Sequence, residues 1–349
     1  MSIDAPRLMT DNLAADGVFS GSGIKTLAFV GALAATEEAG FRDWRSLAGI
    51  SAGAITAMAL AVGYDAQRLR ESLERFDFGP IAEYGHPILP LCERSHGEPR
   101  RDDTLAGWIC TILEESPLAG VDATTTFGQL SVLAPRSTLV VVGTDIAHAR
   151  AVEFPRDVPL YQDEHGEQLT PDAFPIHKAV RISAGFPYYF PPVGGLWDRS
   201  TKKQGVFVDG GLIGSLPVCV FDRPRPSRPT WGFQIHGGFD ARESHPSYRE
   251  IREGAGAGVM LERILETAMC SLDKFELRRS ESRMIPIPTG EVPALNFLLS
   301  RAERDYLYQS GFKAAKEFFI GSPRPENSYG RVPGELQQPS KWGVDFSSP

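Results

Sequence analysis

A serine at the centre of a G-x-S-x-G pattern is the first feature of this sequence that suggests chemistry. Residues 49–53 read GISAG, with an apolar stretch before Ser51 and an alanine-rich stretch after it. Small flanking residues let the backbone turn sharply from a strand into a helix and present the hydroxyl above a sheet. We therefore predict that Ser51 is a nucleophile of acyl transfer, with Gly49 and Gly53 shaping its turn. A plain packing turn of small residues is the alternative.

A serine nucleophile needs a base to accept its proton. Asp209 ends the apolar stretch VFVD and is followed by Gly210 and Gly211, so the backbone can turn there and leave the carboxylate accessible. The alternative for this segment is an ordinary Asp-Gly turn. A histidine is the competing base, because α/β-hydrolases use the chain order Ser, Asp, His. His236, directly after the stretch TWGFQI, lies where such a base is expected.

The segment 18–29, VFSGSGIKTLAF, places a glycine-rich loop before a helix-like run. It fails as a Walker A loop because no GK[ST] follows, and as a dinucleotide fingerprint because Thr26 replaces the third glycine. Successive amide groups at a helix N-terminus form a site for negative charge. We expect an oxyanion hole here, made by the backbone amides of Gly21, Ser22, Gly23 and Ile24.

The elements that would position these residues alternate between strand and helix. A strand, a tight turn and a helix occur twice before residue 62, which is typical of an α/β sheet. Strands are expected at 18–19, 45–51, 137–146, 205–211 and 230–236. Helices are expected at 24–39, 52–62, 66–77, 104–115, 175–183, 248–282 and 303–319.

The same pattern predicts the domain organisation. Residues 1–16 are polar and irregular, which predicts a flexible arm, and residues 17–320 form the catalytic domain. Residues 321–349 are rich in Pro, Gly and Ser, which predicts an extended or disordered tail. Residues 77–103 are broken by Gly and Pro and are expected to form a long loop, a candidate lid over the site.

Four segments, in this order, resemble the motifs of the patatin-like phospholipases: FSGSGIKTLAFVGAL, GISAGAI, AVRISAGFPYYFPPV and FVDGGLIGSLPV. The resemblance implies an α/β fold of three layers, with a largely parallel central sheet flanked by helices. It implies hydrolysis of a lipid acyl ester by a dyad of Ser51 and Asp209, without a catalytic histidine or a cofactor. The glycine loop would then hold the oxyanion.

The glycine loop departs from the family pattern at Ser22 and Thr26, where glycines are usual. If position 22 requires a positive φ, serine costs on the order of 1 kcal/mol there. A lipid- or acyl-binding protein with weak catalysis is therefore an alternative function. Lys25 matches the usual basic residue of the loop, which suggests contact with an anionic intermediate or head group. A solvated surface lysine is the other interpretation.

The composition of the chain limits which binding partners and which cellular location we expect. The net charge is −8, which argues against nucleic-acid binding because phosphates require a basic face. The four cysteines are far apart, which fits neither a zinc site nor a disulfide framework and predicts reduced thiols, no metal and a cytoplasmic location. The N-terminal residues contain no apolar signal segment.

A phospholipid or another acyl-ester lipid is the expected partner. The apolar run 52–62 is too short to span a bilayer, which takes about 20 residues. Any membrane contact is therefore expected to be peripheral, through the apolar and aromatic segments EYGHPILPL and FPYYFPP. Packed turns are the alternative for both segments.

Overall fold

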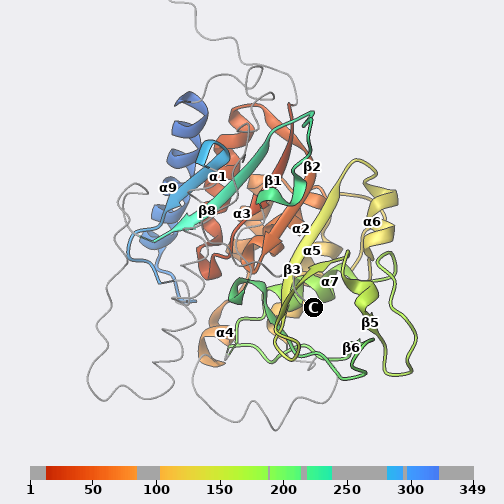
Figure 1. Ribbon diagram of the computed structural model, residues 1–349. Coiled ribbons are helices and arrows are strands. Elements are labelled where there is room, and N and C mark those ends of the chain that lie inside the picture. Colours follow the sequence, from red (N-terminus) through yellow and green to blue (C-terminus); the bar gives the residue numbers. More distant parts are fainter. Residues whose placement is uncertain are drawn as a thin grey trace, which may run out of the picture.

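The central feature of the protein is a mostly parallel sheet with helices against it (Figure 1). The computed structural model describes residues 13–84, 103–187, 189–213, 218–237, 281–293 and 297–321 of the 349-residue chain. Most of the expected helix at 248–282, most of the candidate lid, most of the arm and nearly all of the tail lie outside these described residues.

The seven strands of the sheet run in the order β4-β3-β2-β1-β8-β9, and β7 pairs with β3. Their bounds are β1 Leu13–Phe19, β2 Phe41–Ile50, β3 Thr138–Asp145, β4 Arg150–Phe154, β7 Phe207–Asp209, β8 Thr230–His236 and β9 Met284–Pro288. β4 and β7 are antiparallel to β3, and the other pairings are parallel. β5 (Tyr161–Gln162) and β6 (Trp197–Asp198) form a separate two-stranded sheet.

The helices follow from local sequence signals. α1 and α2 are apolar nearly all round and are almost wholly buried. α3 is amphipathic, and the side chain of Asp65 caps it by accepting from Arg68 N at 2.8 Å. The bounds are α1 Thr26–Glu38, α2 Ala52–Ala61, α3 Ala66–Arg75, α4 Gly79–Tyr84, α5 Thr104–Glu114, α6 Phe127–Leu133, α7 Ile176–Ser183 and α9 Arg301–Gly321. Short 3₁₀ turns are η1 Gly23–Lys25, η2 Val158–Leu160, η3 Gly210–Leu212, η4 Val218–Phe221 and η5 Glu281–Arg283.

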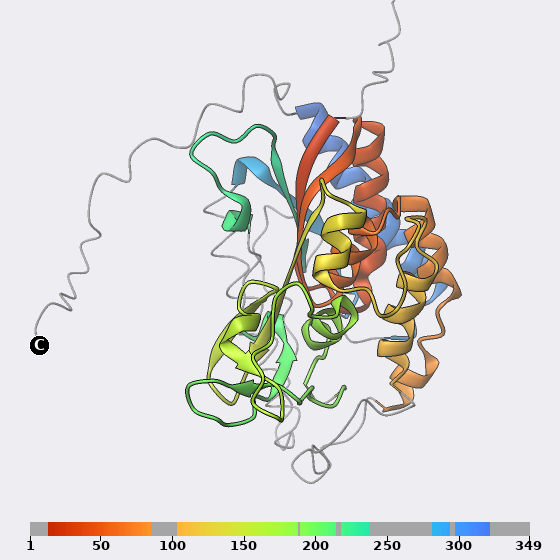
Figure 2. The ribbon, with the colours of Figure 1, turned by 90° about the vertical axis from the view of Figure 1, so that its right-hand side faces the viewer.

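The two faces of the sheet are covered differently. Phe19 and Leu47 point into the main core, which helices α1, α3 and α9 cover on one side of the sheet (Figure 2). Their neighbours Val18 and Ala48 point the other way, into a small cluster with Val218 of η4. This alternation is the period of two that places successive side chains on opposite faces. It confirms the expected α/β class with a mostly parallel sheet flanked by helices.

Helices α1 and α9 pack side by side (Figure 1). A Cβ atom at Gly311 would lie 1.8 Å from the carbonyl oxygen of Ala28, and one at Gly31 would lie 1.9 Å from that of Tyr308. Only glycine permits so close an approach of two helix backbones. α9 is thereby fixed on α1, the helix that follows the glycine loop.

Three expectations differ from the structure. β1 begins at Leu13, so the arm boundary at residue 16 was wrong. Asp16 looked like part of a polar arm, but it is buried and pairs with Arg228 at 2.7 Å. The expected loop at 77–103 contains α4. α9 ends at Gly321, the first residue of the expected tail.

The close approach of α1 and α9 yields a prediction on stability. Gly311→Ala should lower the free energy of unfolding by about 3 kcal/mol, because the methyl group overlaps the backbone of α1. The matched control is Gly107→Ala in α5, where a Cβ meets nothing within 4 Å and should stabilise the fold by about 0.5–1 kcal/mol. Denaturant unfolding measures both, and equal effects of the two substitutions would contradict this packing.

Candidate active site

Ser51 lies at a sharp turn between β2 and α2. Its backbone has φ 57° and ψ −130°, in a region that residues other than glycine rarely adopt. Such strain costs of order 1–3 kcal/mol and persists only where the surrounding structure enforces it. The turn lifts the serine out of the sheet and leaves it at the N-terminus of α2, as the G-x-S-x-G pattern predicts.

The two motif glycines are required by close backbone contacts at this turn. A Cβ at Gly49 would lie 2.2 Å from the carbonyl oxygen of Gly53. A Cβ at Gly53 would lie 2.4 Å from that of Ser20, in the segment that leaves β1. The start of α2 therefore packs directly on the glycine loop, and Ser51 is held next to that loop.

Asp209 meets Ser51 because two strands share one side of β3. β2 pairs with β3 up to Ile50, opposite Val142, and β7 takes over at Gly143, opposite Asp209. β4 occupies the other side of β3 along this stretch. β2 and β7 therefore run toward each other along one line. Their facing ends are a serine and an aspartate.

The two side chains are in direct contact. Ser51 Oγ donates a hydrogen bond to Asp209 Oδ2 at 2.6 Å, and Gly211 N donates to Oδ1 at 2.8 Å. Gly210 belongs to the same turn, η3, and packs on the carbonyl of Val142. The candidate nucleophile and the candidate base are thus together, although 158 residues separate them in sequence.

Burial changes the acidity of Asp209. The carboxyl is 1% exposed, and loss of solvation raises its pKa from 3.8 to about 7, against the opposing effect of the two hydrogen bonds that it accepts. A carboxylate with a pKa near neutrality can both take a proton from a hydroxyl and return it near pH 7. The pair has the geometry and the proton affinity for general base chemistry.

A second buried serine supports the strained turn. Ser183, at the end of α7, accepts a hydrogen bond from Ser51 N at 2.9 Å and donates to the carbonyl of Val142 at 2.5 Å. It is wholly buried. Its hydroxyl links the backbone of Ser51 to β3, the strand that also carries Asp209 through β7. Sequence reasoning did not identify this residue, although it lies in the third of the four quoted segments.

A buried carboxylate fixes the start of β7. Asp145, the last residue of β3, accepts from Val206 N at 3.2 Å through Oδ1 and from the Tyr161 hydroxyl at 3.0 Å through Oδ2. Ile146 N donates in turn to the carbonyl of Val206 at 2.9 Å. The contact with the carboxylate helps to raise the pKa of Tyr161, together with burial. These bonds hold β7 in register three residues before Asp209.

The glycine loop is anchored at its start by hydrogen bonds of Ser20. Ser20 N donates to the carbonyl of Phe233 at 3.0 Å, and Ser20 Oγ accepts from Ile235 N at 3.0 Å. Among the described residues, no acceptor is recorded for the amides of positions 21–24. The register that places Phe19 opposite Gly49 sets this loop beside Ser51. The loop can therefore offer several donors to a negative charge at the serine.

Ser22 and Thr26, where the loop departs from the usual pattern of glycines, stabilise the loop through their hydroxyl groups. Ser22 has φ −139°, so serine carries no positive-φ strain at this position, and the left-handed residue is Gly23, with φ 55°. The hydroxyls of Ser22 and Thr26 lie 3.5 Å apart, and Thr26 Oγ1 donates to the carbonyl of Gly23 at 3.1 Å. Both side chains are buried.

Lys25 is buried rather than solvated. Only 8% of the residue is exposed, and its Nζ donates to Thr289 Oγ1 at 3.0 Å, across to the end of β9. The interpretation as a surface lysine was therefore wrong. A role of its charge near the loop stays a prediction.

His236 lies on a different strand from the pair. It ends β8, which pairs with β1, which in turn pairs with β2, so β8 is two strands, or about 10 Å, from the strand that carries Ser51. Its carbonyl accepts from Thr289 N at 2.8 Å. In the part of the chain that the structure describes, the recorded side-chain partner of the Ser51 hydroxyl is Asp209.

Within the described ranges, no group of three or more His, Cys, Asp or Glu side chains is placed to hold a metal ion. None of the described helices is both long and apolar enough to cross a membrane.

Most of the chain is similar to known proteins, both to a protein family and to an individual relative. Residues 17–222 match the family described as Patatin-like phospholipase. The chain is also 29% identical over 312 residues to the uncharacterized protein YqhO of Bacillus subtilis (strain 168), which corresponds to 87% of this chain and 97% of that protein.

Two bacterial proteins are among the solved structures to which this chain is similar. VipD from Legionella pneumophila superposes with a TM-score of 0.50 at 17% identity, over 89% of this chain and 67% of that chain. Full-length ExoU from the type III secretion system of Pseudomonas aeruginosa, in complex with SpcU, gives a TM-score of 0.45 at 18% identity. This chain spans about half, 53%, of the ExoU chain. At these identities, the likeness to VipD concerns the fold alone.

The raised pKa of Asp209 predicts a pH-dependent gain in stability on its removal. Unfolded Asp209 ionises near 3.8 and the folded residue near 7, so wild-type stability is lost as pH rises between these values and stays low above 7. Asp209→Asn should therefore raise Tm by roughly 5 °C or more at pH 8 and have little effect at pH 4. Asp305→Asn, at an exposed position on α9, is the control. A Tm difference that is independent of pH would contradict the raised pKa.

Proposed function

Because the chain belongs to the patatin-like phospholipase family, we propose that it hydrolyses fatty-acyl esters of lipids through a dyad of Ser51 and Asp209. Membership of this family supports lipid hydrolase activity in general. The first substrate class that we propose is phospholipid, cleaved as by a phospholipase A or a lysophospholipase. We propose that the protein contacts the membrane only at its surface.

In the first half of the reaction, Asp209 accepts the proton of Ser51 as Oγ attacks the ester carbonyl carbon. The carbonyl π electrons move to oxygen, and the resulting oxyanion is held by the amides of Gly21, Ser22, Gly23 and Ile24. The intermediate then collapses to an acyl-enzyme. The leaving alcohol takes the proton back from Asp209.

In the second half, water replaces the alcohol. Asp209 accepts a proton from this water as the water oxygen attacks the acyl carbonyl carbon. The second tetrahedral intermediate then expels Ser51 Oγ, which takes the proton from Asp209. The product is a fatty acid, and the enzyme returns to its starting state. No cofactor takes part in the proposed cycle.

The observation that carries this proposal is the 2.6 Å hydrogen bond between Ser51 Oγ and Asp209 Oδ2 in a buried site. The pKa of Asp209 near 7 supports its role as base, because an ordinary carboxylate would be too weak to compete for the proton of a hydroxyl. The position of His236, two strands away, supports a dyad over a triad.

Release of fatty acid from mixed phospholipid vesicles tests the proposal. Ser51→Ala and Asp209→Asn should each reduce release by about 10³-fold or more, since single members of a catalytic unit carry most of its rate. His236→Ala should retain the wild-type rate. Ser46→Ala is the matched control, because Ser46 is also a buried serine but its hydroxyl accepts from Arg228, within β2 and away from the proposed pocket.

Covalent labelling separates the alternatives. A fluorophosphonate should label wild type at Ser51, located by mass spectrometry of the digested protein. Loss of release in His236→Ala to the same extent as in Asp209→Asn would show a histidine triad. A wild type that binds fatty acid but neither reacts with the fluorophosphonate nor releases product would be an acyl-binding protein, and the proposed function would then be wrong.

A further inference from the structure

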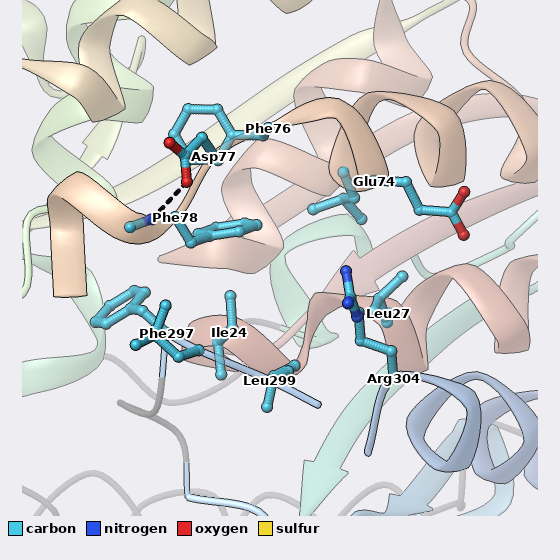
Figure 3. A pocket seen from close by; sticks show the side chains of 12 residues that line it. Ile24, Leu27, Glu74, Phe76, Asp77, Phe78, Phe297, Leu299 and Arg304 are labelled. Carbon is cyan, nitrogen blue, oxygen red and sulfur yellow. Dashed lines mark hydrogen bonds between the residues drawn. The ribbon is translucent and has the colours of Figure 1, made fainter. Parts of the chain in front are cut away.

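A pocket opens beside the glycine loop, on the side of α3, α4 and α9 (Figure 3). Most of its lining residues are apolar or aromatic, with Leu27 next to the loop and leucines of the segment before α9 across from it, and polar atoms form a considerable part of the lining surface. Six of the side chains that point into it are Ile24, Leu27, Phe76, Phe78, Phe297 and Leu299 (Figure 3). Glu74 and Arg304 lie on the same side of the pocket, and the carboxylate of Glu74 points away from the guanidinium of Arg304 (Figure 3).

The pocket touches the proposed oxyanion site through Ile24. The amide of this residue belongs to the loop that would hold the oxyanion, and its side chain forms part of the pocket wall. A carbonyl bound at the loop would therefore lie near this wall of the pocket.

A row of aromatic rings leads to the same pocket from Asp209. Asp209 N donates to the carbonyl of Gly185 at 3.0 Å, and the next residue, Phe186, packs on Tyr189 with ring centroids 5.9 Å apart. Tyr189 lies 5.6 Å from Phe297. Phe297 stacks at 6.5 Å on Phe78, which packs against Trp108. A continuous set of ring contacts therefore joins the pocket wall at Phe297 to the segment that bonds Asp209.

The polar groups near the pocket are mostly engaged with the protein. Asp77 Oδ1 accepts from Gly79 N at 2.9 Å, and Glu74 pairs with Arg70 at 2.8 Å. Arg304 is exposed and marks the outer side. The apolar part of the lining, made of leucine, isoleucine and phenylalanine side chains, suits an alkyl chain.

The size of the pocket limits what enters. Its volume is about 220 Å³, below the roughly 300–1,000 Å³ of pockets that enclose a drug-sized ligand. At roughly 30 Å³ per methylene-sized group, the volume of one water in the liquid, it holds about seven such groups. That is one short chain, and not the two chains of a phospholipid.

We propose that this pocket binds the acyl chain of the substrate, and that it accommodates about seven carbons beyond the carbonyl, as in an octanoyl group. This inference rests on the proposed function. Each methylene that enters the pocket should raise kcat/KM about fourfold, from its transfer out of water. Carbons beyond the eighth should add little, because they extend past the pocket.

The test is the chain-length profile for monomeric p-nitrophenyl esters, from acetyl to dodecanoyl, below their critical micelle concentrations. In wild type, kcat/KM should rise steeply to octanoyl and then level off. Leu299→Trp should fill the pocket and reduce the octanoyl/acetyl ratio of kcat/KM at least about tenfold. Leu160→Trp, at a half-exposed leucine in η2, is the matched control.

Enlarging the pocket provides an independent variant. Phe78→Ala removes a ring from the wall and should move the plateau to longer chains, so the proposal remains testable even where Leu299→Trp does not fold. A wild-type profile that is flat from acetyl to octanoyl would overturn the proposal. Equal profiles for Leu299→Trp and Leu160→Trp would overturn it as well.

Failure of the proposed function gives a different result. If no ester is cleaved at Ser51, the hydrolase proposal fails, and titration calorimetry with octanoate then decides on the pocket. Binding that Leu299→Trp abolishes and Leu160→Trp retains supports an acyl site. No octanoate binding to the wild-type protein overturns it.

Discussion

The arrangement of the candidate site depends on the side of β3 that β2 and β7 share. Because the two strands run toward each other along one line, the residues at their facing ends meet with no space for solvent between them. One of these residues is a carboxylate that burial makes reluctant to ionise. The hydroxyl of Ser51 is its side-chain partner. The strained turn at Ser51, the buried hydroxyl of Ser183 and the clamp at Asp145 all serve to keep these ends in register.

Two features of the candidate site lower the stability of the folded protein. A buried carboxylate that must ionise at neutral pH destabilises the folded state, and the positive φ of Ser51 adds backbone strain. The rest of the fold compensates with a large apolar core and with contacts as close as those between α1 and α9. Backbone strain at Ser51 and an unfavourable charge at Asp209, both held by a rigid scaffold, are expected of a site that binds a transition state better than a ground state.

The sequence predicts those features whose signals are local. The turn at Ser51 was predictable because small residues surround a serine between a strand-like and a helix-like run, and helices such as α3 and α5 follow from caps and periodicity. The contact of Ser51 with Asp209 could be expected only from the order of the four motifs. It depends on a three-residue strand that is antiparallel to its neighbour, and so short a strand has no periodicity of its own.

Features that depend on distant partners could not be predicted. Nothing near Ser183 distinguishes a serine that bonds Ser51 from one that faces solvent, and the burial of Lys25 depends on Thr289 of the segment after β9. Asp16 appeared to belong to an arm because its partner, Arg228, is 212 residues away. The pocket beside the loop combines three separate parts of the chain, around Ile24, Phe76 and Phe297. The sequence also suggested strain that is absent: a positive φ at Ser22 would have been costly, but the φ of this residue is negative.

The pH dependence of kcat/KM on a soluble short-chain ester tests the central claim most directly. If buried Asp209 is the base, it acts only when ionised, so the rate should rise through a single apparent pKa of about 7 and level off above it. His236→Ala should show the same rise, because that side chain takes no part in the proton transfer. A midpoint near the ordinary value of an aspartate, or a rise that disappears in His236→Ala, would contradict the account.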